Sequence, residues 1–554
     1  MAEDKLTTWQ RFIGLLKLEK KDFLQILYYA IFAGLVNLSV PLGIQAIVNL
    51  IQGARITTSW IVLVFLVTMG VAFVGVLQLM QIRILENIQQ KIFTRASFEF
   101  TYRFPKIKMS ELQNFYPPEL ANRFFDVITI QKGISKLVLD FPAAVLQIVF
   151  GLILLSLYHP FFILYGILLV FLIYLVFLFT ARRGLNTSIE ESKMKYRIAH
   201  WIQEVARTLI SFKISGKTQH AINKNDALVS KYLDARESHF QILKLQFIQM
   251  IGFKTLVTAG LLVIGGILVL NQQMNIGQFV AAEIIILLII SSVEKMIMGL
   301  ENFYDLLTSL EKLGEVVDKK LEPIGGDRSF ADNHSLEIEL KNVGFTSFDG
   351  REILKDVNLT IRSGEKIYLG GINGSGKSIL LKIIAGLIEP HRGKIYVNGI
   401  SLKNLDLNYY RSLVGQSLSE ESLFEGSLLD NITFGDDSIG QAEISEIMEK
   451  TGLKEFVREQ PEGLETLIFP EGLQLPHTIA KKIILARSLI RKPKLLILNE
   501  PLHQVDKEEE QKIIDYLFGL KNDWSIIVSS RDDIWKEKCQ RHILLDKGII
   551  QNNS

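Results

Sequence analysis

Six apolar runs constrain this chain more than any other feature, because about 20 consecutive apolar residues are enough to cross the hydrocarbon core of a bilayer. They occupy residues 23–51, 60–82, 139–158, 161–180, 247–270 and 276–298. The composition agrees, since 48% of the 554 residues are hydrophobic and only 22% are charged, which is too apolar for an ordinary soluble protein. The sequence therefore predicts an all-α membrane domain with six spanning helices.

The connections between these runs predict the topology. Residues 52–59, 159–160 and 271–275 form short links, whereas 83–138 and 181–246 form long ones. The long links carry the basic residues Arg83, Lys91, Arg95, Arg103, Lys106, Lys108, Arg182, Arg183, Lys193, Lys195 and Arg197. By the positive-inside rule, both long links and both termini lie in the cytoplasm, so we expect a multi-pass protein of the cytoplasmic (inner) membrane. Both links read mainly as helix, so the spans should extend below the membrane, with a break at Pro117-Pro118.

The N-terminal segment, residues 1–22, is polar and charged and leads into the first run without a cleavable signal peptide. Within it, residues 7–20 place Trp9, Phe12 and Leu16 among Arg11 and Lys17. This pattern predicts an amphipathic elbow helix, which either lies on the membrane surface or packs on protein.

Ionisable residues inside the spans are costly in lipid and usually face protein or water. Lys254 and Glu283 are expected to lie deepest, and either line a substrate cavity or pair structurally within the bundle. Glu294 and Lys295 are expected near the cytoplasmic interface, where snorkelling of the side chain explains them without a function.

The second strong feature is a phosphate-binding loop. Gly371 to Ser378 reads Gly-Ile-Asn-Gly-Ser-Gly-Lys-Ser and fits the pattern G-x-x-x-x-G-K-[ST], between an apolar run at 367–369 and an apolar-periodic one at 379–387. We therefore expect strand, loop and helix in succession, with Lys377 reaching the terminal phosphates and the Ser378 hydroxyl bound to Mg²⁺. The alternative is a glycine-rich turn without a ligand. The predicted nucleotide-binding residues are Gly371, Asn373, Gly374, Ser375, Gly376, Lys377 and Ser378.

A second motif follows the apolar run 495–498, which ends in Asn499 and Glu500. In a P-loop ATPase, the strand beside the loop presents one carboxylate toward Mg²⁺ and another toward the attacking water. Asn499 offers the metal only a weak, uncharged contact, and Glu500 is the candidate general base.

The domain organisation follows from these patterns. Residues 1–22 form the elbow, 23–315 the transmembrane domain, 316–334 a linker, and 335–554 a soluble α/β domain in which short strands alternate with helices. The single cysteine, Cys539, excludes an internal disulfide, and the net charge of +2 gives no reason to expect nucleic acid.

At this point the chain resembles the ATP-binding cassette (ABC) transporters of the exporter type, with six spans fused ahead of one nucleotide-binding domain. The resemblance rests on the P-loop, on residues 423–432 and 483–489, and on Asp506, which takes the D-loop position after the Glu500 strand. It implies that two halves associate and that ATP is sandwiched between one P-loop and the partner's signature motif. It also implies coupling loops, with the first contact at residues 119–123 and Asp126.

Several departures from the family fall on its chemistry. The signature position, Leu-Ser-Gly-Gly-Gln in the family, holds Leu475, Pro476, His477, Thr478 and Ile479. Ser419 replaces an expected glutamine, Ser530 an expected histidine, Ser347 an adenine-stacking aromatic, and Asn499 a metal carboxylate. Phe345 and Phe348 are near enough in sequence to replace that aromatic. Because phosphoryl transfer depends on preorganised charge, we expect ATP binding with slow or absent hydrolysis by this chain's own site.

The predicted function is that of one half of a dimeric ABC exporter, which uses ATP and Mg²⁺ to move a peptide, lipid or amphiphilic compound across the cytoplasmic membrane. The alternative is a pseudo-transporter that binds nucleotide and regulates or scaffolds a partner. Damaged parts in both sites of a homodimer favour a heterodimer, with a homodimer as the alternative. Pro41, Leu42 and Gln45 in the first span resemble the exporters of type I secretion, which makes a periplasmic adaptor a candidate partner.

Overall fold

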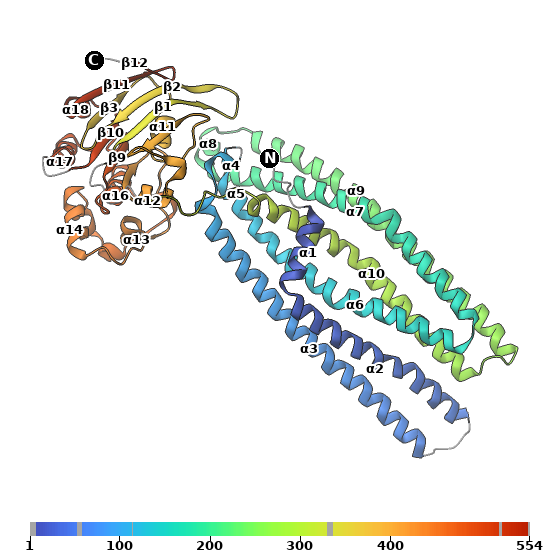
Figure 1. Cartoon of the computed structure of the whole chain (residues 1–554). Coiled ribbons are helices and arrows are strands. Elements are labelled where there is room, and N and C mark those ends of the chain that lie inside the picture. The colour runs from blue at the N-terminus through green and yellow to red at the C-terminus, as the bar shows by residue number, and fades with distance from the viewer. Residues whose placement is uncertain (1–6, 53–57, 114, 329–335, 520–522, 552–554) are drawn as a thin grey trace. The chain divides into compact units, whose positions relative to one another are not determined.

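The computed structural model describes residues 7–52, 58–113, 115–328, 336–519 and 523–551 and contains two compact units (Figure 1). The first unit comprises the chain up to Pro105 together with Phe115–Lys319. The second comprises Lys106–Asn114 and the chain from Lys320 onward.

The first unit is built from long helices, of which six are long and apolar enough to cross a membrane. These are α2 (Lys20–Gln52), α3 (Thr58–Arg103), α6 (Asp126–Tyr158), α7 (Phe161–Arg207), α9 (His220–Leu270) and α10 (Ile276–Val317). Each contains one of the six predicted runs, which confirms the spanning pattern. Their lengths of 33 to 51 residues exceed the roughly 20 that cross a bilayer, so most of them continue as helix beyond it.

Three helix pairs organise this unit: α10 packs along α6, α3 along α2, and α9 along α7 (Figure 1). The most buried element is α10, whose inward stripe includes Ile285, Ile289 and Tyr304. Glycines permit close packing at two of these contacts. A Cβ at Gly184 would lie 2.4 Å from the ring of Tyr304, and one at Gly151 would lie 3.0 Å from Ile289.

The predicted N-terminal helix is α1 (Thr8–Leu18), and it packs on protein. Its Phe12 is buried against Phe303 of α10, with ring centroids 5.7 Å apart. The Arg11 guanidinium pairs with Asp318 just beyond the end of α10. The opposite face of α1 still exposes apolar side chains.

The short elements in the long links are η1 (Phe104–Lys106), α4 (Met109–Leu112), α5 (Pro117–Ala121), η2 (Asn122–Phe125) and α8 (Leu209–Ile214). Helix α5 begins at Pro117, as expected for a residue that tolerates only the first turn of a helix. The part of this link that folds with the second unit is Lys106–Asn114. There Lys108 donates its backbone N–H to the Lys320 carbonyl at 3.0 Å and pairs its ammonium with Glu389 at 2.8 Å.

The resemblance put the first coupling contact at residues 119–123 and Asp126, and that position stays a prediction. Both charged ends of that stretch are engaged inside the first unit. Buried Arg123 donates from Nε to Glu315 at 2.9 Å and lies 3.8 Å from the centroid of the Tyr196 ring. The Tyr196 hydroxyl in turn donates to Asp126.

For Lys254, the structure agrees with one of the two sequence-based alternatives, structural pairing within the bundle. Its ammonium forms an ion pair with Glu294 across α9 and α10 at 3.8 Å. The reason is the hairpin, because both residues lie at similar distances from the turn between Leu270 and Ile276. Glu283 is half-buried and has no ion pair within the described residues.

The second unit has a mixed α/β fold built on three sheets, which confirms the predicted fold class. The four-stranded antiparallel sheet has the order β2 (Glu352–Ile361), β1 (Ile338–Thr346), β4 (Arg392–Val397) and β5 (Ile400–Ser401). The six-stranded sheet has the order β12 (Ile549–Gln551), β11 (Arg541–Asp546), β3 (Lys366–Gly370), β10 (Ser525–Ser529), β9 (Leu495–Asn499) and β6 (Val414–Ser417). Strands β7 (Gly426–Ser427) and β8 (Leu467–Ile468) pair separately.

The strands of the six-stranded sheet are parallel except for β12. The helices of this unit are α11 (Lys377–Ile384), α12 (Leu407–Ser412), α13 (Leu428–Thr433), α14 (Gln441–Lys450), α15 (Lys454–Glu459), α16 (His477–Leu489), α17 (Lys507–Leu517) and α18 (Asp533–Lys538), with the 3-10 turns η4 (Leu402–Asn404), η5 (Gly463–Glu465) and η6 (Pro470–Gly472). Strand β9 is buried on both faces: Leu495 and Ile497 belong to one apolar core, Leu496 and Leu498 to the other. A central parallel strand reads as a continuous apolar run for this reason.

Candidate functional site

The predicted phosphate loop forms between β3 and α11, so the expected strand, loop and helix are confirmed. Strand β3 ends at Gly370 and α11 begins at Lys377, with Gly376 as its N-cap at φ 105°. Ser378 is therefore in the first turn of the helix. The free N–H groups and the positive end of a helix dipole both favour an anion at this position.

Three loop glycines adopt backbone angles that side chains disfavour, at φ 142° for Gly371, 83° for Gly374 and 105° for Gly376. Two of them are also sterically confined. A Cβ at Gly371 would lie 2.2 Å from the Leu545 carbonyl oxygen, and one at Gly376 would lie 2.8 Å from the Leu354 side chain. A Cβ at Gly374 would meet nothing within 4 Å. The loop thus needs glycine at two positions for space and angle and at the third for angle alone.

A cavity of about 520 Å³ opens over this loop. It brings together most of the predicted nucleotide residues with Asn499, Glu500, Ser419 and Ser530. Ser375 is an exception, because its side chain is buried beneath the loop, and its hydroxyl has no hydrogen-bond partner among the described residues. Its backbone N–H donates to the Ile372 carbonyl at 3.2 Å, so its predicted contact with the nucleotide stays a prediction.

Lys377 folds back over the loop, where its ammonium donates to the carbonyls of Gly371 at 2.6 Å and Ile372 at 3.1 Å. Partial burial lowers the pKa of Lys377 from its ordinary value, and the nearby Glu500 carboxylate opposes this effect. A cation on a flexible stem at the mouth of the loop is suited to bind phosphate oxygens.

Asn499, at the end of β9, is buried and connects two hydroxyls. Its side-chain amide donates to Ser378 Oγ at 3.4 Å and to Ser419 Oγ at 3.2 Å. We call Asn499, Ser378 and Ser419 the neutral trio, because these side chains, which lie where a metal ion would bind, carry no negative charge. Mg²⁺ prefers oxygen ligands and is usually bound through one or two carboxylates together with substrate phosphates.

Glu500 follows Asn499 in the left-handed region, at φ 49°, a conformation that non-glycine residues rarely adopt outside functional or tightly constrained sites. Its carboxylate accepts the Arg531 backbone N–H at 3.3 Å and the Ser530 hydroxyl at 3.5 Å. Its own N–H donates to the Ser529 carbonyl at 2.8 Å. The turn after β10 therefore orients the only carboxylate that lines the cavity within the described residues.

Arg531 is a charged cavity residue to which the sequence analysis assigned no role. Its guanidinium lies 3.8 Å from Glu500 and donates to the Asn373 side chain at 3.4 Å. It arrives there because β10 lies between β3 and β9, which places the end of β10 beside the loop. Its position after an apolar strand was the only signal available in the sequence.

The signature-position residues do not line this cavity within the described part of the chain. Pro476 is the N-cap of α16, and His477 and Thr478 open the helix. Leu475 and Ile479 are half-buried against an apolar core. The loss of an N–H at Pro476 therefore leaves the helix start intact, since the N–H groups of the first helical turn follow it.

Asp506 and the two candidates for adenine stacking, Phe345 and Phe348, have different surroundings. The Asp506 carboxylate caps α17 by accepting the Glu508 N–H at 3.0 Å. Phe345 is buried in the core against His391, so it is unable to stack on adenine and that expectation was wrong. Phe348 is 71% exposed and is the aromatic that stays available, next to Ser347.

These residues fit a triphosphate nucleotide, since the loop leads into the start of α11, where N–H groups of the first turn lack helical partners, and Lys377 lies at its mouth. For Mg²⁺ the fit is weaker. The Ser378 hydroxyl would hold the ion together with phosphate oxygens, and the ion would neutralise phosphate charge there, whereas the Asn499 amide donates to Ser378 and offers at most a weak contact. The combined features define a class: a multi-pass helical membrane domain joined to a P-loop nucleotide-binding domain.

Known protein families give this class a name. Residues 23–293 match the ABC transporter transmembrane region, and residues 354–503 match the ABC transporter family. The chain belongs to the ABC transporters, as an exporter-type half-transporter with a transmembrane domain fused to a nucleotide-binding domain.

Individual relatives agree with this assignment. The chain is 31% identical over 291 residues to the alpha-hemolysin translocation ATP-binding protein HlyB of Escherichia coli O157:H7, covering 52% of this chain and 41% of the relative. It is 24% identical to the lactococcin-A transport/processing ATP-binding protein LcnC of Lactococcus lactis subsp. lactis, over 100% of this chain and 77% of LcnC. The matches to the first curated relatives span about half their length or less.

A solved structure shares the fold. A bacterial Atm1-family ABC exporter with ATP bound superposes with a TM-score of 0.83, at 15% sequence identity, and the match covers 97% of this chain and 95% of that one. At this identity the likeness concerns the fold alone.

Proposed function

We propose that this chain is one half of a dimeric ABC exporter that binds ATP at the Gly371–Ser378 loop and couples it to export of a peptide, lipid or amphiphilic compound. The observation that carries the proposal is the phosphate loop at the start of α11 in a chain with six spanning helices. The names of relatives, which include a hemolysin translocator and a lactococcin transporter, support a peptide or protein substrate. The nucleotide-binding domain and both termini lie in the cytoplasm.

We also propose that hydrolysis by this chain's own site is slow, with Glu500 as the general base. The neutral trio supports this, because the side chains that would hold Mg²⁺ contribute no charge to the neutralisation of a phosphoryl-transfer transition state. Ser530, which replaces the expected histidine, supplies only a hydroxyl, and that hydroxyl points to Glu500.

The partner in the dimer is then a better-equipped half, with a homodimer as the alternative. Leu475–Ile479 keeps the helix start of α16 but replaces small side chains with bulky ones, which disfavours close approach to a partner's nucleotide. If a periplasmic adaptor takes part, it binds at the opposite side of the membrane from the nucleotide.

A second candidate function is a pseudo-transporter that binds nucleotide and regulates or scaffolds its partner. The neutral trio favours it as well, since binding survives the loss of a metal carboxylate more easily than catalysis does. The two functions differ in whether any assembly containing this chain turns over ATP through its own site.

The experiment compares the full-length chain alone and with co-purified partners in proteoliposomes. An exporter half gives ATP-dependent transport that is lost in Lys377→Ala of this chain. A pseudo-transporter gives transport that survives Lys377→Ala, or nucleotide binding without turnover in every combination. Mass measurement of the purified native complex distinguishes the heterodimer from the homodimer, and a homodimer with turnover at both sites would contradict the proposed pairing.

A further inference from the structure

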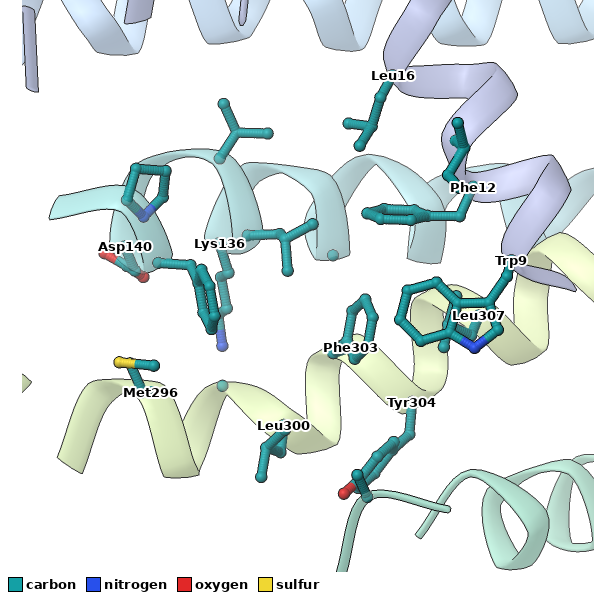
Figure 2. A pocket seen from close by; sticks show the side chains of 18 of the residues that line it. Trp9, Phe12, Leu16, Lys136, Asp140, Met296, Leu300, Phe303, Tyr304 and Leu307 are labelled. Atoms are coloured by element: carbon teal, nitrogen blue, oxygen red, sulfur yellow. The ribbon is translucent and has the colours of Figure 1, made fainter. Parts of the chain in front are cut away.

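A second and larger cavity, of about 1140 Å³, lies inside the first unit (Figure 2). Its lining comes from α1, α2, α6, α7 and α10, all within that unit. The volume exceeds the roughly 300–1,000 Å³ of ordinary small-molecule pockets. None of the residues of the nucleotide site contributes to it. The space is therefore large enough for a ligand with a long apolar part.

The walls of this cavity are mainly apolar. Figure 2 shows Trp9 and Phe12 of α1 and Phe303 of α10 gathered at one end, with Met296 and Leu300 further along α10. The cavity also reaches apolar surface that faces outward. Ile13, Leu24 and Leu27 line it and are 47%, 42% and 37% exposed. This outward apolar surface would allow a hydrocarbon chain from the surrounding bilayer to reach the cavity.

Five cationic side chains line the same cavity, against one acidic residue, Asp140. They come from five different helices, and Figure 2 shows one of them, Lys136, reaching from α6 toward α10. The cations are Lys17 on α1, Lys20 on α2, Lys136 on α6, Arg182 on α7 and Lys295 on α10. The convergence of one cation from each helix distinguishes this cavity from a row of basic residues along a single membrane-facing helix.

None of these cations forms an ion pair with any residue that the structure describes. Some other cations of the same unit are matched, such as Lys91 with Asp22 at 2.5 Å and Arg95 with Glu19 at 2.8 Å. Snorkelling to the membrane interface accounts for single lysines near helix ends. It does not account for the convergence of five exposed cations, one from each of five helices, on a single open and largely apolar cavity.

We propose that this cavity binds an anionic phospholipid of the surrounding membrane, with its acyl chains against the apolar walls and its phosphate among the cations. Basic pockets between transmembrane helices are suited to acidic lipid head groups, and the apolar lining adds the burial of hydrocarbon. The bound lipid joins α1 to α6 and α10. The proposal does not depend on whether the P-loop site hydrolyses ATP.

The test is native mass spectrometry of the full-length protein in detergent with equal amounts of dioleoyl-phosphatidylglycerol and dioleoyl-phosphatidylcholine. Because the acyl chains are identical, preference reports the head group alone. The wild type retains phosphatidylglycerol preferentially, and Lys136→Gln/Arg182→Gln weakens that retention by about 20–30-fold, since each cation near an anionic lipid is worth about fivefold in affinity. Inorganic phosphate does not displace the lipid.

Matched controls are available on the same helices. Lys132→Gln/Arg183→Gln removes the same charge from α6 and α7 at exposed residues outside the lining, and leaves lipid retention unchanged. Gly299→Phe fills the cavity without altering charge, because a Cβ at Gly299 meets nothing within 4 Å, and removes both lipids. Gly252→Phe, equally open but outside the lining, removes neither.

Four results would overturn the proposal. They are a wild type without head-group preference, equal losses in the two charge variants, full lipid retention in Gly299→Phe, and displacement by inorganic phosphate. The last would define a simple anion site instead. Retained nucleotide binding in each variant verifies that the protein is folded, so a failure of lipid binding is distinguishable from a failure of the nucleotide site.

Discussion

The three loop glycines lead to a graded prediction, because each would meet different obstacles on conversion to alanine. At Gly374 the obstacle is the backbone angle alone, at φ 83° with nothing within 4 Å of a new Cβ. Holding a non-glycine residue in a left-handed conformation costs about 1–2 kcal/mol. In the free Gly374→Ala protein, the loop relaxes to a conformation without this strain. It has to return to the strained conformation to bind ATP, so we expect the affinity for ATP to fall by about 5–30-fold.

Gly371→Ala adds a collision that the loop is unable to relieve. The Cβ would lie 2.2 Å from the Leu545 backbone oxygen, which is fixed in β11, and 2.8 Å from Ser375 Oγ. We expect more than about 100-fold loss of ATP affinity, since several kcal/mol of overlap is beyond local adjustment. Gly376→Ala falls between the two, because its nearest obstacle, at 2.8 Å, is a terminal methyl of the buried Leu354 side chain and not a backbone atom.

The assay is equilibrium titration of purified full-length variants with a fluorescent ATP analogue, together with thermal unfolding. Gly399→Ala is the matched control, since it carries a similar angle, φ 79°, in the β4–β5 turn with nothing within 4 Å. It should lower stability by about 1 kcal/mol and leave ATP affinity unchanged. Equal losses for Gly374→Ala and Gly371→Ala, or normal binding by Gly371→Ala, would show that the loop geometry is not what binds the nucleotide.

Three further predictions concern the neighbouring residues. Asn499→Asp adds a carboxylate beside Ser378. The affinity for ATP with Mg²⁺, divided by the affinity with a chelator, should then rise at least about tenfold. An unchanged ratio would exclude a metal at the neutral trio. Burial raises the pKa of the Glu421 carboxyl to about 7, although the Leu418 N–H and Arg487 lower it in part. The folded protein therefore binds this proton more tightly than the unfolded chain does, and the free energy of unfolding falls as pH rises from about 4.5 to 7. Glu421→Gln should therefore flatten the decline of the thermal midpoint between pH 5 and 8, and an identical decline would contradict this. Phe345→Ala should cost about 3–5 kcal/mol of unfolding free energy, whereas Phe348→Ala should leave stability within about 0.5 kcal/mol and weaken adenine nucleotide binding; equal effects on stability would refute the assignment.

The local features of this protein could be predicted from its sequence. Length and apolarity are enough to identify a spanning helix, and the loop glycines and Lys377 follow one another in the chain. Asn499 and Glu500 were also recognised, because a buried parallel strand reads as an unbroken apolar run and its end marks the edge of the sheet.

The features that were missed depend on contacts between distant segments. Arg531 reaches the cavity because β10 lies between β3 and β9, an order that periodicity does not encode. Phe345 is buried because it lies on the face of β1 that packs on the core. Phe348 lies beyond the end of β1, in the turn that follows, and is exposed. Pairing of Lys254 within the bundle was one of two predicted alternatives, but its partner Glu294 was not named, because the hairpin turn sets which residues of the two antiparallel helices face each other.

The central claim is that this chain holds ATP at an intact phosphate loop but turns it over slowly. The most direct test measures ATP occupancy and phosphate release on the same wild-type protein in proteoliposomes. We predict one ATP bound per chain, lost in Lys377→Ala, with phosphate release well below about 1 per second, the lower end of typical enzyme turnover. Release at an ordinary enzymatic rate that Glu500→Gln abolishes, or no ATP bound at all, would contradict the claim.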